Sequence, residues 1–531
     1  MERPHVRFAL TLPLALLLAA ASVAASAAPP VRIGTITIRA LDVYADDEAG
    51  HGRVYRVANA LHPETRDSVI RKFLLFREGD EYHPDRIAES ERNLRALHFL
   101  KSASVTATEP HDGVVDVTVT TQDAWSIAPE TQAGNKGGQS TYGASITDTN
   151  VLGRGKEVSI SWDKTIDRTR LGFDLQDPAL SSSLWNTHLA YGRNSDGYDH
   201  RAQFRRPFYS FATPWAAEVS YQGFRQSDRL YHDGFIASEF AQKHTQIVAA
   251  YGRSIGSSDG VANRLTAGVR FTDDSFDALP FSPEEVVPGR RRFRYALVRF
   301  EHTGNDFLKL NFVNKDIRYE DFNLGAQVSV EAAVSPRAFG VDSTSSFLRM
   351  TASNGARIGE RAFIVPSVAV ESRFDGGPQN AIASAGVTFV RRDTARFPQA
   401  TVARVAINAG WRLDPETQFF ADGLTGLRAY RVHSFAGARS FVVNVEQRLY
   451  LGREILQLIS PGVVAFADAG NATDGGAGQL MRLYTDAGIG LRIGLPRTPK
   501  NLLRIDFGYA MKQDPRGRGG LMVSVSSGQA F

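Results

Sequence analysis

Leu503-Arg504-Ile505-Asp506-Phe507-Gly508-Tyr509-Ala510-Met511 is the stretch of sequence that decides the fold. Apolar side chains occupy every second position, and the residues between them are Arg504, Asp506 and Gly508. A period of two places these two sets on opposite faces of a β-strand. The stretch from Ala487 to Leu495 repeats the pattern. A soluble β-sandwich would alternate in the same way, so the period alone leaves open which face points inward.

The alternation of apolar and polar residues extends over the whole chain after Trp125. Alternating segments are separated by clusters of Gly, Asp, Asn, Ser and Pro, which favours strands joined by turns. Beyond Ala28 no run approaches the ~18 apolar residues of a membrane helix. A closed barrel is the other structure that satisfies its backbone polar groups in lipid. With membrane strands of ~9–11 residues, residues 126–531 predict a mostly β fold, a transmembrane antiparallel β-barrel of about sixteen strands.

The N-terminus has the layout of a secretory signal peptide. Arg3 and Arg7 precede an apolar run from Phe8 to Ala25, and Ala25-Ser26-Ala27 offers the small residues of a cleavage site. A short membrane anchor is the alternative, but Pro13 interrupts the run. We therefore expect residues 1–27 to be a signal peptide and the protein to be exported.

Residues 31–125 mix two periods and predict a small α+β domain. The stretch Val31–Ile38 alternates like a strand, Arg66–Phe76 and Asp85–Leu100 have helical spacing, and two further alternating stretches follow. The expected order is strand, helix, helix, strand, strand.

Composition excludes several classes of protein. The chain has no cysteine, which rules out disulfides, thiolate metal sites and a lipid-modified N-terminal cysteine. The formal net charge of +4 is small for 531 residues and gives little support to nucleic-acid binding. The histidines lack metal-binding spacing, and the glycine pairs lack the context of a phosphate-binding loop. We expect no enzyme activity, no catalytic or metal-binding residues, no cofactor and no nucleic-acid partner.

Local motifs in the barrel region carry a family resemblance. Asp148–Gly155 is similar to the first hairpin of the BamA/TamA-type outer-membrane assembly proteins. Gly426-Leu427-Arg428-Ala429-Tyr430 resembles the loop motif of that superfamily, and Phe466-Ala467-Asp468-Ala469-Gly470 resembles its F-x-D-x-G strand. The chain ends on Phe531, a terminal aromatic of the kind read as an outer-membrane insertion signal. The N-terminal domain resembles a POTRA domain, with an unrelated α+β domain as the alternative.

The loop motif predicts a specific contact. If the long loop around Arg428 folds back into the barrel, its guanidinium can form a bidentate hydrogen bond to Asp468, with Glu446 as a second acceptor. The resemblance implies that these three residues form a loop-to-wall lock. The alternative is that such charges only keep the lumen hydrated. Ala429 stands where the family usually has glycine, so the loop tip would be strained if this position required a positive φ.

The resemblance implies a role in inserting or translocating other proteins. The barrel would lie in the outer membrane with the N-terminal domain in the periplasm. The partners would be unfolded outer-membrane or secreted clients, membrane lipid, and accessory periplasmic proteins or lipoproteins. The barrel would open at a seam, which we expect between a strand near Tyr142–Asp148 and a terminal strand over Leu521–Phe531. A two-partner-secretion-type pore for one exoprotein and a passive channel remain as alternatives.

Overall fold

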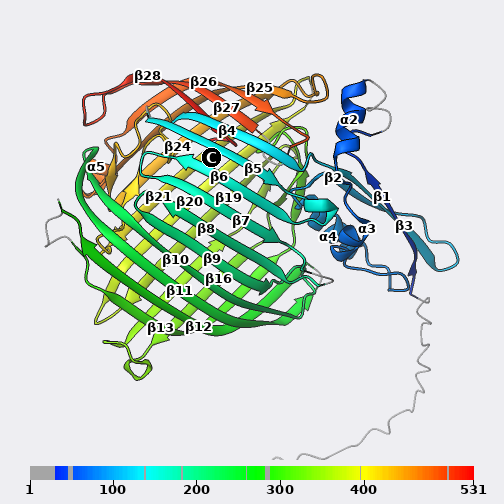
Figure 1. Ribbon diagram of the computed structural model, residues 1–531, viewed down its shortest axis with the longest axis horizontal. Helices are drawn as coiled ribbons and strands as arrows, with labels where there is room; N and C mark the ends of the chain where they lie inside the picture. The colour runs from blue at the N-terminus through cyan, green and yellow to red at the C-terminus, as the bar shows by residue number, and fades with distance from the viewer. Residues whose placement is uncertain are drawn as a thin grey trace, which may run out of the picture.

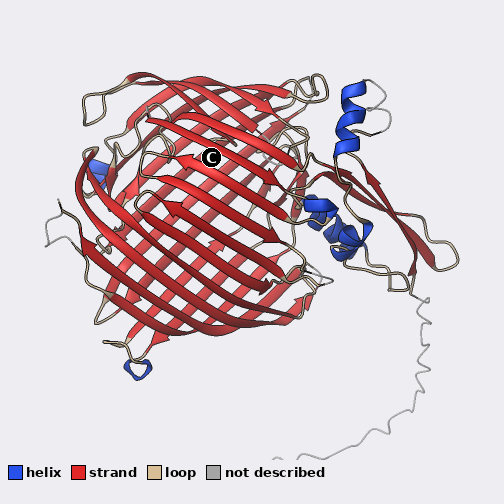
Figure 2. Cartoon of the chain, viewed as in Figure 1, coloured by secondary structure: helices blue, strands red, loops and turns tan. Residues whose placement is uncertain are grey.

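The computed structural model describes residues 30–45, 52–136, 139–180, 183–258, 260–280, 287–394, 396–498 and 502–531. The expected signal peptide, residues 1–27, lies outside these ranges. Figure 1 shows a large β-barrel with a small α+β domain at one end. We call the barrel end next to this domain the domain end, and the opposite end the distal end. Figure 2 shows that strands dominate and that most of the helix lies in the small domain.

The N-terminal domain contains a three-stranded sheet in the order β1-β3-β2. Strand β3 is central, parallel to β1 and antiparallel to β2. Val115, Val117 and Val119 of β3 are fully buried, because every second residue of this strand faces the helices. The elements are β1 (Arg32–Leu41), α2 (Arg53–Leu61), α3 (Asp67–Lys72), α4 (Pro84–Arg95), β2 (Leu100–Ala107) and β3 (Val114–Asp123).

Helix α4 has the end signals that its sequence suggests. Pro84 begins the helix, Asp85 lies in its first turn and Arg95 in its last, where each charge suits the helix dipole. Ile87 and Leu94 point into the core of the domain. The helix ends at Arg95, earlier than the expected Leu100, because Leu100 already begins β2. The sequence reading also missed α2, which lies between β1 and the first expected helix.

The remaining chain forms one antiparallel sheet whose strands follow each other around a closed barrel. Each strand of the wall pairs mainly with its neighbours in sequence, as Figure 1 shows. The first ten strands are β4 (Ile127–Lys136), β5 (Gln139–Asp148), β6 (Glu157–Lys164), β7 (Thr169–Asp177), β8 (Asn186–Asn194), β9 (Gly197–Arg206), β10 (Trp215–His232), β11 (Phe235–Ser258), β12 (Val261–Ala278) and β13 (Arg291–Gly304). The others are β16 (Gln327–Ser335), β17 (Ser345–Ser353), β18 (Ala356–Ile358), β19 (Ala362–Phe374), β20 (Pro378–Asp393), β21 (Gln399–Trp411), β24 (Arg439–Tyr450), β25 (Ser460–Thr473), β26 (Tyr484–Gly494), β27 (Leu502–Ala510) and β28 (Gly520–Ser527).

The expected number of about sixteen wall strands is too low. In the described part of the chain, 21 strands form the wall. Strands β17 and β18 pair with successive parts of β19 and so share one position, which leaves 20 positions. The estimate failed because several connections are very short: Asp233 and Gly234 join β10 to β11, and three residues join β19 to β20. Less of the chain is spent in loops than the estimate allowed.

The seam between the two ends of the wall also differs from the expectation. The neighbour of the last strand, β28, is β4, and not the expected strand at Tyr142–Asp148, which is β5. The sequence reading missed β4 because Pro129 and polar residues break its alternation. Strand β28 ends at Ser527, before the expected Phe531. Both seam strands are short: β4 has 10 residues and β28 has 8, whereas β11 has 24.

The two faces of the wall resolve the question that periodicity left open. Ile489, Phe507 and Leu521 are exposed on the outer surface, while Arg492 and Asp506 are buried inside the barrel. A soluble protein would place these sets the other way round, so the outer surface suits lipid. No helix in the described ranges is long and apolar enough to cross a membrane.

The first barrel hairpin connects the wall to the N-terminal domain. Asn150 Nδ2 donates to Thr65 Oγ1 at 2.7 Å, and Arg66 N donates to Gly153 O at 3.1 Å. Thr65 in turn donates from its backbone and its hydroxyl to the buried carboxylate of Asp123. The motif Asp148–Gly155 therefore lies against the small domain, and Gly153 is needed there because a Cβ would lie 2.1 Å from Glu64 O.

Candidate functional site

The long connection between β21 and β24, residues 412–438, enters the lumen from the distal end. It contains a two-stranded sheet of β22 (Phe419–Phe420) and β23 (Ala436–Gly437). Asp422 organises the loop: its carboxylate accepts hydrogen bonds from the backbone N–H groups of Leu424, Thr425 and His433. Leu427 and Tyr430 are buried, and the Tyr430 hydroxyl donates to Thr485 O at 3.0 Å. The loop is thus a folded part of the barrel interior.

Arg428 connects the loop to the wall. Its Nε and Nη2 donate to the two carboxylate oxygens of Asp468 at 2.7 and 2.8 Å, the bidentate geometry expected for this pair. Its Nη1 donates to Glu446 Oε1 at 2.5 Å. The guanidinium also lies 3.7 Å from the centre of the Phe466 ring, a cation–π contact. Arg428 is 4% exposed and Glu446 is fully buried, so water screens these charges little.

The wall extends this contact into a larger charged cluster. Glu446 also accepts hydrogen bonds from Arg448 Nε at 2.6 Å and from Arg492 Nη2 at 3.2 Å. Arg492 Nη1 donates to Asp506 Oδ1 at 2.6 Å, and Arg504 Nε lies 3.3 Å from Asp506 Oδ2. Buried charges are stable only when paired, and here Glu446 and Asp506 are each shared between guanidinium groups.

Glycines of the wall make room for the loop tip. A Cβ at Gly508 would lie 3.1 Å from the Cβ of Ala429, and a Cβ at Gly488 would lie 2.5 Å from the Phe466 ring. Both glycines therefore lie packed against protein. Ala429 is not among the residues with positive φ, so alanine is accommodated there without backbone strain. The left-handed position of the motif is Gly426, with φ +132°.

A second segment, residues 305–326, enters the lumen from the domain end, and we call it the inner segment. It contains the hairpin β14 (Phe307–Leu310) and β15 (Glu320–Asn323). Its Val313 carbonyl accepts a hydrogen bond from Arg448 Nη1 at 2.6 Å, and Phe312 stacks near Tyr450 with ring centres 5.4 Å apart. The inner segment therefore meets the charged cluster from the side opposite to the loop.

The inner segment also binds the N-terminal domain. Arg95 of α4 donates from Nε and Nη2 to Asp321 at 2.9 and 2.7 Å. Lys309 Nζ lies 2.7 Å from Glu91 Oε1, and the guanidinium of Arg92 lies 4.3 Å from the centre of the Phe307 ring. One continuous set of contacts thus joins α4, the inner segment and the buried arginines of the wall.

The C-terminal residues after β28 turn into the lumen. Gly528 has φ +76°, and Gln529 then contacts Arg492 Nε at 3.0 Å and the Tyr450 hydroxyl at 2.8 Å. The Phe531 ring packs against the apolar group around Val313 and lies 5.6 Å from the Arg448 guanidinium. The structure places this terminal aromatic, expected as an insertion signal, inside the barrel.

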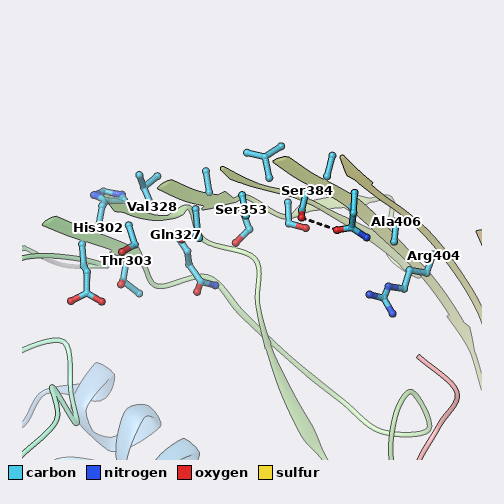
Figure 3. A pocket seen from close by; sticks show the side chains of 18 residues that line it. His302, Thr303, Gln327, Val328, Ser353, Ser384, Arg404 and Ala406 are labelled. Atoms are coloured by element: carbon cyan, nitrogen blue, oxygen red, sulfur yellow. Dashed lines mark hydrogen bonds between the residues drawn. The ribbon is translucent and has the colours of Figure 1, made fainter. Parts of the chain in front are cut away.

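A polar space remains on the other side of the lumen. It has a volume of about 490 Å³ and lies along β13, β16, β17 and β19–β21. Thr303, Gln327, Ser353, Ser384 and Arg404 line it, and Figure 3 shows these side chains along the wall. No catalytic role follows from their arrangement. Within the described ranges, no group of three or more His, Asp or Glu side chains is placed to hold a metal ion.

The structure brings together most of the residues singled out from the sequence. Arg428, Asp468 and Glu446 meet directly, and Phe466 stacks on the same guanidinium. Gly470 opposes Val442 in the adjacent strand, where a Cβ would lie 2.6 Å from Phe441 O. The sequence reading did not find Asp422, Val313 or the inner segment. Alternation already placed Arg492 and Asp506 on the polar faces of their strands, but gave no reason to pair them.

These features define a β-barrel whose lumen is occupied on one side by its own loop, inner segment and C-terminus. No protein-family model matches the chain, and no curated protein matches it. Solved structures similar to it include CdiB from Escherichia coli, with 13% identity and a TM-score of 0.49 over 94% of this chain and 76% of that one. CdiB from Acinetobacter baumannii has 11% identity and a TM-score of 0.47, over 94% and 74%. BamA from Haemophilus ducreyi lacking POTRA domains 1–3 has 14% identity and a TM-score of 0.38, over 94% and 84%. BamA is one of the proteins to which the sequence motifs pointed.

Proposed function

We propose that this protein sits in the bacterial outer membrane and helps other proteins to insert into it. In this proposal the N-terminal domain is a POTRA domain in the periplasm, where it receives an unfolded client. The client then reaches the membrane at the seam between β4 and β28. The protein makes and breaks no covalent bond, and burial of the client's apolar strands in lipid drives the process.

The observation that carries this proposal is the contrast between the lumen beside β24–β28, which is occupied, and the wall at the seam, which is low. The loop around Arg428, the inner segment and Phe531 occupy the lumen on the side where β24–β28 form the wall. This favours a route along the wall over a route through an open pore. A passive channel would need a continuous aqueous path, which these segments narrow.

The seam lies in a low part of the wall, because β28 has eight residues, as β6 has, and most other wall strands are longer. Eight residues of β28 span about 27 Å along the strand, and a tilt of about 40° reduces this to about 20 Å across the membrane. The hydrocarbon core is ~30 Å thick, so the bilayer must thin beside β28. On the other side of the seam, Pro129 of β4 has no N–H to donate. A thinned bilayer and a weakened strand pair both lower the barrier to a client strand.

Depletion of the protein from its host tests the proposal. An assembly factor predicts that several unrelated outer-membrane proteins decrease together, measured by quantitative proteomics of the membrane fraction. Loss of one secreted protein with an unchanged outer membrane would contradict it and indicate a two-partner-secretion-type pore. Ion conductance of the purified protein without any client defect would indicate a passive channel.

A further inference from the structure

A groove lies between the N-terminal domain and the outside of the barrel wall. Its volume is about 880 Å³. One side consists of the end of α3, the connection to α4 and the first turns of α4. The other side consists of the turns that precede β8 and β10, at the domain end of the wall. In Figure 1, α3 and α4 lie next to this end of the barrel.

The groove is strongly basic. Five cationic side chains line it: Arg71, Lys72, Arg77, Arg86 and Arg206. In the described part of the chain none of the five forms an ion pair, and the side chains of Arg77 and Arg86 form no hydrogen bond either. The two acidic residues at the groove, Asp80 and Glu89, are engaged with the backbone: Asp80 accepts from Arg77 N at 2.8 Å and Glu89 from Phe211 N at 2.9 Å. The groove thus offers positive charge to an anionic ligand.

Aromatic residues continue the groove onto the lipid-facing surface. Trp185 stacks on Phe204 with ring centres 4.4 Å apart, and Trp215 lies 6.2 Å from Tyr251. Phe204 and Tyr251 are exposed on the outer face of the wall. Arg206 joins the two regions, because its guanidinium lies 4.0 Å from the centre of the Trp215 ring and also lines the groove. Tryptophan and tyrosine at a barrel end mark the level of the lipid headgroups.

We propose that this groove binds the headgroup of an anionic phospholipid from the leaflet next to the N-terminal domain. The phosphate lies between Arg77 and Arg86, and the acyl chains run along the outer wall past Phe204 and Tyr251. The unpaired cations favour binding of an anion, and the exposed aromatic surface beside them favours contact with acyl chains. An acidic polypeptide would use the charges but not that surface. The bound lipid holds the domain against the membrane, a role separate from that of the lumen.

Native mass spectrometry of the full mature protein tests this inference. The protein is released from detergent with phosphatidylglycerol or phosphatidylethanolamine, and the fraction retaining each lipid is compared. We expect preferential retention of phosphatidylglycerol. The double variant Arg77→Gln/Arg86→Gln should reduce this retention by about tenfold or more, because basic residues near an anionic headgroup each add to the attraction. Neither substitution removes a side-chain hydrogen bond or ion pair within the described residues, so the fold should be kept.

The matched control is Arg225→Gln/Lys243→Gln. These two exposed cations are cross-strand partners on the outer face of β10 and β11, near the distal end. The control should retain phosphatidylglycerol like the unmodified protein. Equal retention of both lipids, or equal losses in the two double variants, would overturn the inference. Displacement of the lipid by glycerophosphoglycerol or by a poly-glutamate peptide at equal concentration would also overturn it, because the acyl chains would then contribute nothing.

Discussion

At the scale of single residues, Arg428 is where the largest energetic effect is expected. Arg428→Ala would leave Asp468 buried without its arginine and would remove one of the three arginines paired with Glu446, and breaking a buried pair costs about 3–5 kcal/mol. The measurement is equilibrium unfolding of the barrel in detergent micelles. As a control, Arg349→Ala removes the half-exposed pair with Glu371 and should cost about 0–1 kcal/mol. Equal effects of the two substitutions would show that Arg428 is only a hydrating charge.

The backbone of the loop tip yields a second prediction. Gly426→Ala should destabilise the loop, because φ is +132° there and the new Cβ would lie 2.7 Å from Val442 Cγ1. Ala429→Gly should change little, since Ala429 needs no positive φ. The rate of cleavage within residues 412–438 in limited proteolysis measures the effect of both substitutions. Faster cleavage in the Ala429→Gly variant than in the Gly426→Ala variant would contradict this assignment of the left-handed position.

The sequence predicted individual residues well where a local pattern or a motif existed. The period of two assigned Arg504 and Asp506 to one face, and the resemblance suggested the partners of Arg428. It could not predict that Glu446 pairs with three arginines, because only Arg448 lies on the same strand, whereas Arg428 and Arg492 lie on other elements. Such sharing depends on the register between strands, which no local pattern specifies.

At the scale of elements, the inner segment is the least expected part of the structure. Its residues 305–326 have no clear periodicity, and its position depends on Arg392 and Arg448, which lie more than 80 residues away in sequence. The strand count was wrong for a related reason, since turn lengths must be known before strands can be counted. Strand β4 was missed because a strand at a seam can carry proline and polar residues.

Removal of the inner segment gives the prediction at this scale. Phe307 and Asn323 are cross-strand partners, so a short Gly-Ser turn can replace residues 308–322. The shortened protein should conduct ions in planar bilayers more strongly than the full-length protein. The reason is that the segment whose Val313 carbonyl contacts Arg448 no longer occupies the lumen. Shortening the distal β25–β26 loop at α5 (Ala477–Leu480) is the control and should leave the conductance unchanged. Equal conductance of both variants and the full-length protein would contradict the role of the segment as a plug.

At the scale of the whole molecule, the contacts between α4, the inner segment and Arg448 connect the N-terminal domain to the lumen. Arg95→Ala should break this connection, because Arg95 and Asp321 form a bidentate pair with both side chains largely buried. We expect faster hydrogen exchange in residues 305–326, with exchange in β11 unchanged. Unaltered exchange in the inner segment would mean that its position depends on the wall alone.

The most direct measurement of the central claim is cross-linking of a client to the seam. The chain has no cysteine, so any disulfide with a client must form at the single cysteine that is introduced. Val523 faces outward on β28 beside the seam, and Ile247 is similarly exposed on β11 in the tall part of the wall. A client with one cysteine in its terminal strand should form a disulfide with Val523→Cys and not with Ile247→Cys during assembly. Equal cross-linking at both sites, or at neither, would contradict insertion through the β4–β28 seam.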